Sequence, residues 1–171
     1  FVFALGLGML LPATEVVARP VRIKSAAGIT AQLDAASGRY EIRTRRPDWQ
    51  FAGELGQPAR NVIVENGNDR IGAYQEIRFT WRTNASVTGS IRIYDSRPVA
   101  LLALECDQAA DELPAVFPQF TSVPAGLHHF SYKNDVFAPP SFALEPNGTP
   151  WLLFDDRADA VIISPADNFM I

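Results

Sequence analysis

The chain has 171 residues, of which 47% are hydrophobic and 20% charged, so it is long enough to bury a core and differs from disordered chains. A formal net charge of -4, with no basic run longer than Arg45-Arg46, argues against binding to nucleic acid or to an anionic membrane surface. Cys106 is the single cysteine, which excludes an internal disulfide and a cysteine-rich metal site.

Residues 1–18 have the pattern of a secretory signal peptide that lacks its Met and its basic start. Residues 1–11 are apolar and uncharged, and the run is too short to span a bilayer. The small residues Val16 and Ala18 stand where a signal peptidase would cut, before Arg19-Pro20. We therefore expect a secreted or periplasmic protein with no membrane attachment after signal removal, and a domain over residues 19–171. A buried N-terminal strand is the alternative.

The first half of that domain consists of short alternating segments separated by turns. Apolar and polar residues alternate over residues 21–24, 29–33 and 39–44, and a Gly-containing turn at 34–38 makes 29–44 a hairpin. Two further strands are predicted at 49–53 and 60–65, the second closed by an Asn-Gly-Asn-Asp turn at 66–69.

The clearest alternation covers residues 74–82, where Ile77, Phe79 and Trp81 share one face. A turn leads into a returning strand at 89–94, and residues 99–104 are apolar on both faces. We predict a meander whose last strand is central in its sheet.

The last third contains an extended loop followed by a final hairpin. Three prolines lie between residues 107 and 126, where we expect a loop with one helical turn at its start. Strands are predicted at 127–132 and 141–145. The apolar runs 151–154 and 160–163 flank an Asp-rich connector and predict a hairpin buried in the middle of the sandwich. The sequence stops at Ile171, where another strand should begin, so we expect a domain cut before its last strands.

These elements predict an all-β fold, with two stacked and mostly antiparallel sheets and little or no helix. Within it, His128 and His129 are strand neighbours and should point to opposite faces, one into the core and one into solvent. We expect no metal ion and no cofactor. No nucleophile elbow is present, so no catalytic residue is assigned.

Carboxylates and aromatic rings supply the candidate binding residues. Asp155, Asp156, Asp159 and Asp167 lie within 13 residues; such carboxylates can serve turns, hold Ca²⁺ or contact sugar hydroxyls. Exposed aromatic faces bind sugar rings, whereas Trp81 follows the inward phase of its strand and should be core. The substrate-binding candidates are Trp49, Trp151, Tyr132, Asp155 and Asp156.

Three stretches carry a family resemblance. The Gly-Arg-Tyr-Glu-Ile hairpin, the Ile-Arg-Ile-Tyr-Asp-Ser-Arg-Pro strand and turn, and Pro-Trp-Leu-Leu-Phe-Asp-Asp before Ser-Pro-Ala-Asp-Asn-Phe resemble the N-terminal β-sandwich of α-galactosidase and raffinose-synthase-like glycoside hydrolases. The resemblance covers about residues 20–171. It implies a sandwich of the galactose-mutarotase type that precedes a catalytic (β/α)₈ barrel, and no barrel motif is found here.

The resemblance therefore implies a non-catalytic domain of a secreted glycoside hydrolase, which supports and edges a sugar site. Its expected partners are a carbohydrate and a C-terminal catalytic domain of the same chain. Two alternatives stay open: a free-standing carbohydrate-binding module, and a cell-envelope interaction domain without a ligand. Fold alone does not separate them, because sandwiches host many functions.

Overall fold

The computed structural model describes residues 19–83, 86–106, 117–133, 136–138, 150–164 and 166. The described residues form thirteen strands and no helix. Hydrogen bonding groups the strands into three antiparallel sheets, which we name A, B and C. The predicted signal peptide, the helical turn at the start of the 107–126 loop and the strand at 141–145 lie outside the described residues.

Sheet A contains the first four strands and one short later strand. Its order is β1-β2-β3-β4-β9, and its members are β1 (Val21–Lys24), β2 (Ile29–Asp34), β3 (Arg39–Thr44), β4 (Gln50–Glu54) and β9 (Phe120–Ser122). The predicted 29–44 hairpin is confirmed by the β2–β3 register. Its turn depends on Gly38, which has a φ of +72° and whose added Cβ would collide with the Gln57 backbone.

Sheet B is a meander in the order β5-β6-β7-β8. Its strands are β5 (Arg60–Asn68), β6 (Ala73–Arg82), β7 (Ser86–Tyr94) and β8 (Ala100–Cys106). The predicted hairpin between 74 and 94 is confirmed by the β6–β7 register. The prediction of a central strand at 99–104 is wrong within the described strands, since β8 pairs only with β7. Its apolar residues are partly buried on both faces, a pattern that an edge strand can share with a central one.

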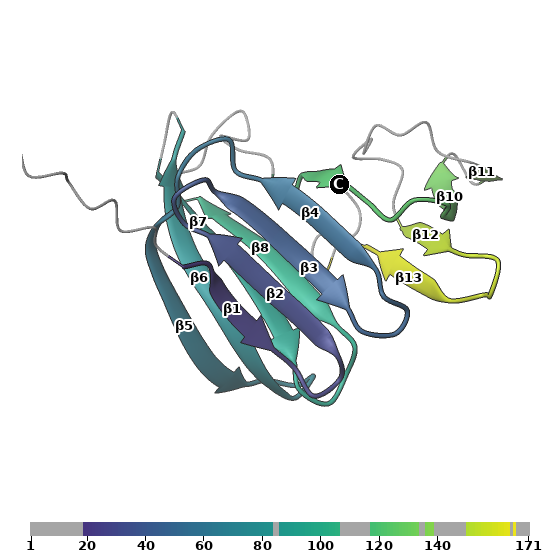
Figure 1. Ribbon diagram of the computed structural model, residues 1–171, viewed down its shortest axis with the longest axis horizontal. Coiled ribbons are helices and arrows are strands. Elements are labelled where there is room, and N and C mark those ends of the chain that lie inside the picture. The colour runs from purple at the N-terminus through teal and green to yellow at the C-terminus, as the bar shows by residue number, and fades with distance from the viewer. Residues whose placement is uncertain are drawn as a thin grey trace, which may run out of the picture.

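Sheets A and B stack face to face (Figure 1), with β1 against β6 and β2 against β7. Ile77, Phe79 and Trp81 all point into the space between the sheets and are fully or nearly fully buried, as predicted. From sheet A, Ala31 and Leu33 meet them in the same cluster. Burial of this alternating set stabilises the stack, and the prediction of an all-β antiparallel sandwich is confirmed.

Sheet C is a third, smaller sheet beside the sandwich (Figure 1). It has the order β11-β10-β12-β13 and consists of β10 (His128–Lys133), β11 (Val136–Ala138), β12 (Trp151–Phe154) and β13 (Ala160–Ile163). Trp151 and Leu153 of β12 pack with Trp49 and Phe51 from the β4 region. Sheet C therefore covers the β4 end of sheet A.

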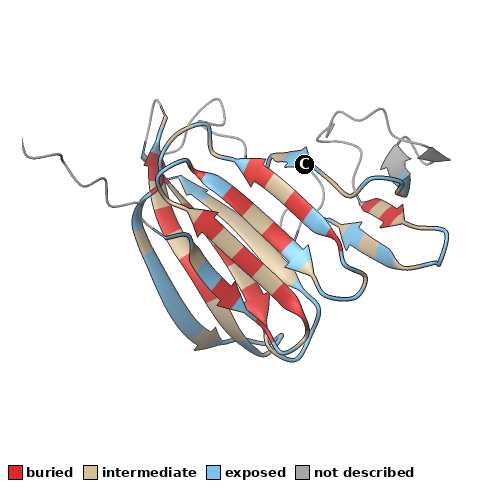
Figure 2. Cartoon of the chain, viewed as in Figure 1, coloured by how far each residue is buried: buried red, intermediate tan, exposed pale blue. Residues whose placement is uncertain are grey.

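The hairpin at 151–163 forms, but its predicted place in the middle of the sandwich is wrong. Along β12, buried and half-buried residues alternate (Figure 2), so one face packs on sheet A and the other does not. β13 pairs only with β12 among the described strands, and Ile162 is 67% exposed. The apolar residues of this hairpin therefore lie in two different environments: those on one face pack against sheet A, and those on the other face lie at the surface.

Candidate functional site

The structure places the two predicted tryptophans in the core. Trp49 and Trp151 are 7% and 6% exposed and belong to the cluster that joins sheet C to sheet A. Among the described residues, the Trp151 Nε1 has no hydrogen-bond partner. Neither ring has a broad face exposed to solvent, so the role that the structure shows for both is packing in the core. Their role in sugar binding stays a prediction.

Asp155 organises the turn between β12 and β13. Its Oδ1 accepts hydrogen bonds from the backbone N–H of Arg157 at 2.9 Å and of Asp159 at 3.1 Å. Its Oδ2 accepts from the Arg157 guanidinium at 3.3 Å. Burial opposes its charge, but these donors hold the pKa of Asp155 below its ordinary value. The turn chemistry considered for this aspartate is therefore present.

Asp156 points in another direction and stands at the end of sheet C. Its side chain is 92% exposed, and its Oδ1 lies 2.7 Å from Nε2 of His128. The strand register explains the pair: His128 faces Phe154 across β10 and β12, and Asp156 follows two residues later. The bond holds an imidazole and a carboxylate side by side at the surface. Such a pair can donate to and accept from hydroxyl groups.

Three aromatic rings form a cluster on the same face, with His128 and Phe130 on β10 and Phe154 on β12. The ring of Phe154 lies 5.3 Å from that of His128 and 5.5 Å from that of Phe130, the latter nearly parallel at 14°. Phe130 is 38% exposed. The register places Leu152 opposite Phe130, and Ile162 opposite Leu152. We call His128, Phe130, Leu152, Phe154 and Ile162 the outer face of sheet C.

The two histidines separate as the alternation predicted. His128 lies on the outer face of sheet C, whereas His129 is paired with the buried Leu153 and is only partly exposed. Tyr132 lies in β10, but its side chain is outside what the structure describes. Phe130 and Phe154 were not predicted as site residues. Knowledge of the β10–β12 register would have identified them, but a long segment separates the two strands, so the sequence does not indicate that they pair.

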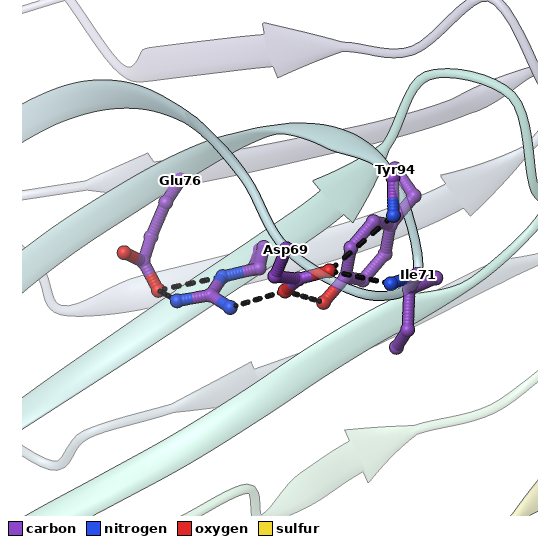
Figure 3. A network of polar contacts seen from close by, with 6 residues as sticks. Asp69, Ile71, Glu76 and Tyr94 are labelled. Atoms are coloured by element: carbon purple, nitrogen blue, oxygen red, sulfur yellow. Dashed lines mark hydrogen bonds and ion pairs between the residues drawn. The ribbon is translucent and has the colours of Figure 1, made fainter.

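A second polar constellation lies on the outer side of sheet B (Figure 3), where Asp69 stands between Glu76 and Ile71. The Arg92 guanidinium binds Asp69 at 2.9 Å and Glu76 at 3.2 Å, and lies 3.9 Å from the centre of the Tyr74 ring. The Tyr94 hydroxyl donates to Asp69 at 2.8 Å.

Each charged group in this network has a protein partner, so we assign it a structural role. Asp69 also accepts from the backbone N–H groups of Ile71 and Gly72, which fixes the β5–β6 turn to the face of the sheet. Burial opposes the charge of Asp69, but the Tyr94 hydroxyl and these two amides hold its pKa below the ordinary value. Glu76 is 4% exposed and is neutralised by Arg92.

Within the described ranges, no group of three His, Cys, Asp or Glu side chains is placed to hold a metal ion. In the same ranges no helix is long and apolar enough to cross a membrane. Comparisons of the chain with protein-family models, with curated proteins and with solved structures give no match.

Proposed function

We propose that this chain is the non-catalytic β-sandwich domain of a secreted glycoside hydrolase, and that the outer face of sheet C contributes carbohydrate binding. One observation carries the proposal: a partly exposed cluster of aromatic rings adjoins a surface His–Asp pair. Phe130 and Phe154 provide the apolar part, and His128 and Asp156 provide the polar part.

The chemistry of a sugar fits both parts of that surface. One side of a pyranose ring presents C–H groups, which pack on an aromatic ring and remove apolar area from water. Its rim carries hydroxyls, which need both donors and acceptors. The strands hold the rings by backbone pairing and by the buried face beneath them. A rigid surface loses little conformational freedom on binding, which favours positioning of a substrate.

The carboxylates support binding rather than acid–base catalysis. A retaining glycosidase uses two carboxylates about 5–5.5 Å apart, one protonated and one charged. Here Asp155 is engaged by two backbone amides and by Arg157, and its lowered pKa keeps it charged. Asp156 is bonded to His128 at the surface. We therefore assign catalysis to another domain of the same protein, and to this domain the support of the sugar.

The test is affinity gel electrophoresis of the 171-residue chain in gels that contain a neutral glucan, mannan or galactan. We expect retardation in at least one gel, and about a tenfold loss of affinity in Phe130→Ala, because one exposed ring supplies the stacking surface. Ile63→Ala is the matched control, since Ile63 is 47% exposed on β5, in sheet B. Migration that no polysaccharide alters, or a Phe130→Ala variant as retarded as the wild type, would reject the proposal.

A protein-binding domain of the cell envelope is the second candidate. The observation that favours it is Ile162, which is the most exposed large apolar residue described and adjoins Leu152 on the same face. The polysaccharide gels, run with the wild type and with Ile162→Lys, separate the two candidates. If the face binds sugar over Phe130, the variant keeps its polysaccharide retardation; if the face binds protein, the polysaccharide gels show no retardation before or after the change.

A further inference from the structure

We infer that β5 is an interface with a second copy of this chain: two copies pair antiparallel along β5, so that their B sheets join into one continuous sheet. β5 belongs to sheet B, whereas the surface proposed to bind carbohydrate is the outer face of sheet C, so this interface is independent of the proposed function. Three observations carry it: an unpaired edge, an uncovered apolar segment and a self-complementary order of charges.

β5 is a long strand with one open edge. Among the described strands it pairs only with β6, so on its other side alternate backbone N–H and C=O groups have no strand partner. It has nine residues, of which seven are exposed and none is buried (Figure 2). The edge strands of sheets A and C have only three or four residues each. A long, exposed edge is a template for pairing with another strand.

Three consecutive apolar residues, Val62, Ile63 and Val64, lie in the first half of β5. Ile63 and Val64 are 47% and 48% exposed, although they stand on opposite faces of the strand. Val64 pairs with the buried Ile77 and therefore lies on the core side of sheet B. It is left half exposed because sheet A stacks over β6 and β7, with β1 against β6 and β2 against β7. A further strand beside β5 would remove apolar area on both faces from water.

The order of these residues fits pairing with an identical strand. An antiparallel pair of identical strands has a two-fold axis, and each residue then faces the residue at the same distance on the other side of that axis. With the axis at Ile63, this residue lies opposite Ile63 of the second copy, and Val62 lies opposite Val64. The apolar segments of the two copies then lie fully opposite each other.

Opposite charges stand at the two ends of the apolar segment. Arg60 lies opposite Thr80, and Glu65 lies opposite Glu76. Thr80 and Glu76 are on the same face of β6, so Arg60 and Glu65 share one face of sheet B, with the bulge between them restoring this match. Neither side chain has an ion-pair partner among the described residues.

The two-fold axis at Ile63 brings these charges together in complementary pairs. It sets Asn61 opposite Glu65 of the second copy, and Arg60 is the next residue along, within reach of that carboxylate. Because of the symmetry, the same contact forms twice. A parallel pair in register would instead set Arg60 beside Arg60 and Glu65 beside Glu65. The order of charges therefore selects the antiparallel pair of identical strands.

A single pair of strands is a narrow interface. Specific, stable interfaces bury about 1,200–2,000 Å², and pairing over the few residues around Ile63 covers less. We therefore expect a reversible dimer that dissociates on dilution.

Sedimentation velocity of the 171-residue chain from about 1 μM to about 1 mM tests the dimer. We expect a reversible shift from monomer to dimer across this range. Glu65→Arg should raise the dimer dissociation constant about tenfold, because two attractive contacts become repulsive. Adding Arg60→Glu to Glu65→Arg should restore the wild-type dimer, since the charges are exchanged but stay complementary. Ile162→Lys is the matched control: it also adds a positive charge, on sheet C, and should leave the dimer unchanged.

An oxidative cross-link tests the register. The background is Cys106→Ser, which removes the single cysteine, and Ile63→Cys then places a thiol opposite the same thiol of the second copy. Residues directly opposite in an antiparallel pair have Cα atoms about 4.5–5.5 Å apart, which a disulfide can bridge. We expect a cross-linked dimer from Ile63→Cys and a monomer from Asn68→Cys, because Asn68 lies at the far end of β5.

A chain that stays monomeric at every concentration overturns the inference. A dimer that Ile162→Lys abolishes and Glu65→Arg leaves intact places the second copy on sheet C and also overturns it. So does a double variant that dimerises no better than Glu65→Arg alone, or equal cross-linking at positions 63 and 68. Unchanged urea midpoints of the variants verify that each one is folded.

Discussion

Asp69 shows how one side chain fixes both a turn and a sheet face. It accepts hydrogen bonds from two backbone amides of its own turn, and it binds Arg92 and Tyr94 of β7. The carboxylate is the common acceptor, so its charge matters more than its shape. No periodicity in the sequence indicates that Asp69 contacts Arg92 and Tyr94, because these partners are 23 and 25 residues away.

The lowered pKa of Asp69 predicts a pH-dependent contribution to stability. A depressed folded pKa means that the stabilisation is complete above the ordinary aspartate value of 3.8 and is lost as the pH falls through the lowered value. We expect Asp69→Asn to lower the urea midpoint near neutral pH, with a difference from wild type that shrinks as the solution is acidified. Asn66→Ser, an exposed change on β5, is the control. A difference that stays constant down to strongly acid pH would contradict the role of the charge.

At the scale of the elements, local alternation predicted most strands but not their surroundings. The hairpins β2–β3 and β6–β7 and the strand β1 were found from their period of two, because each buries one face. β12 and β13 were predicted from their apolar content, and the prediction that both faces of this hairpin are buried was wrong. When a strand is apolar on both faces, its sequence does not indicate which face packs on the neighbouring sheet and which face lies at the surface.

β5 continues through the turn that was predicted at residues 66–69, and the reason lies in its pairing with β6. Asn66, Gly67 and Asn68 continue the strand instead of turning, and Gly67 pairs with Tyr74. A Cβ at Gly67 would collide with the Tyr74 ring, which is itself held against Arg92 and Tyr94. The glycine that signalled a turn is thus a site of close approach between a ring and the backbone.

This approach predicts a coupled pair of substitutions. Gly67→Ala should lower the free energy of unfolding by about 1–3 kcal/mol, because the ring must leave a packed position. In a Tyr74→Ala background the same change should cost much less, since the obstacle is gone. Urea denaturation of the four proteins measures the coupling. Equal costs in both backgrounds would show that the ring is not the obstacle.

At the scale of the whole molecule, the position of the proposed surface could not be predicted from the sequence. An aromatic and carboxylate surface was expected, and Asp156 belongs to the surface now proposed. Trp49 is a candidate because it lies in irregular chain after Pro47-Asp48, and Trp151 because it begins the final hairpin. In the structure both fill the junction between sheets A and C. The exposed phenylalanines depend on long-range register, which a single sequence does not specify.

The two cores meet at Phe120, which packs against both buried clusters. Its ring lies 5.9 Å from Phe51 and 6.2 Å from Tyr40. Because Phe120 packs against both clusters, unfolding of sheet C should also expose the edge of the main core, the cluster between sheets A and B. We therefore expect sheets A, B and C to unfold in a single transition.

Trp151→Ala tests this continuity. The change empties a large buried site and should lower the free energy of unfolding by about 3–5 kcal/mol. Trp49→Ala should cost a similar amount, because Trp49 is equally buried. Trp81 lies in the other cluster, and in a Trp49→Phe, Trp151→Phe background it is the one tryptophan left, so its fluorescence reports on the main core. With Trp151→Ala in place of Trp151→Phe, that signal should shift to lower urea together with the circular dichroism. If instead the Trp81 transition keeps its midpoint while the circular dichroism loses part of its amplitude earlier, sheet C is a separate unit and the site proposed on it has a scaffold of its own.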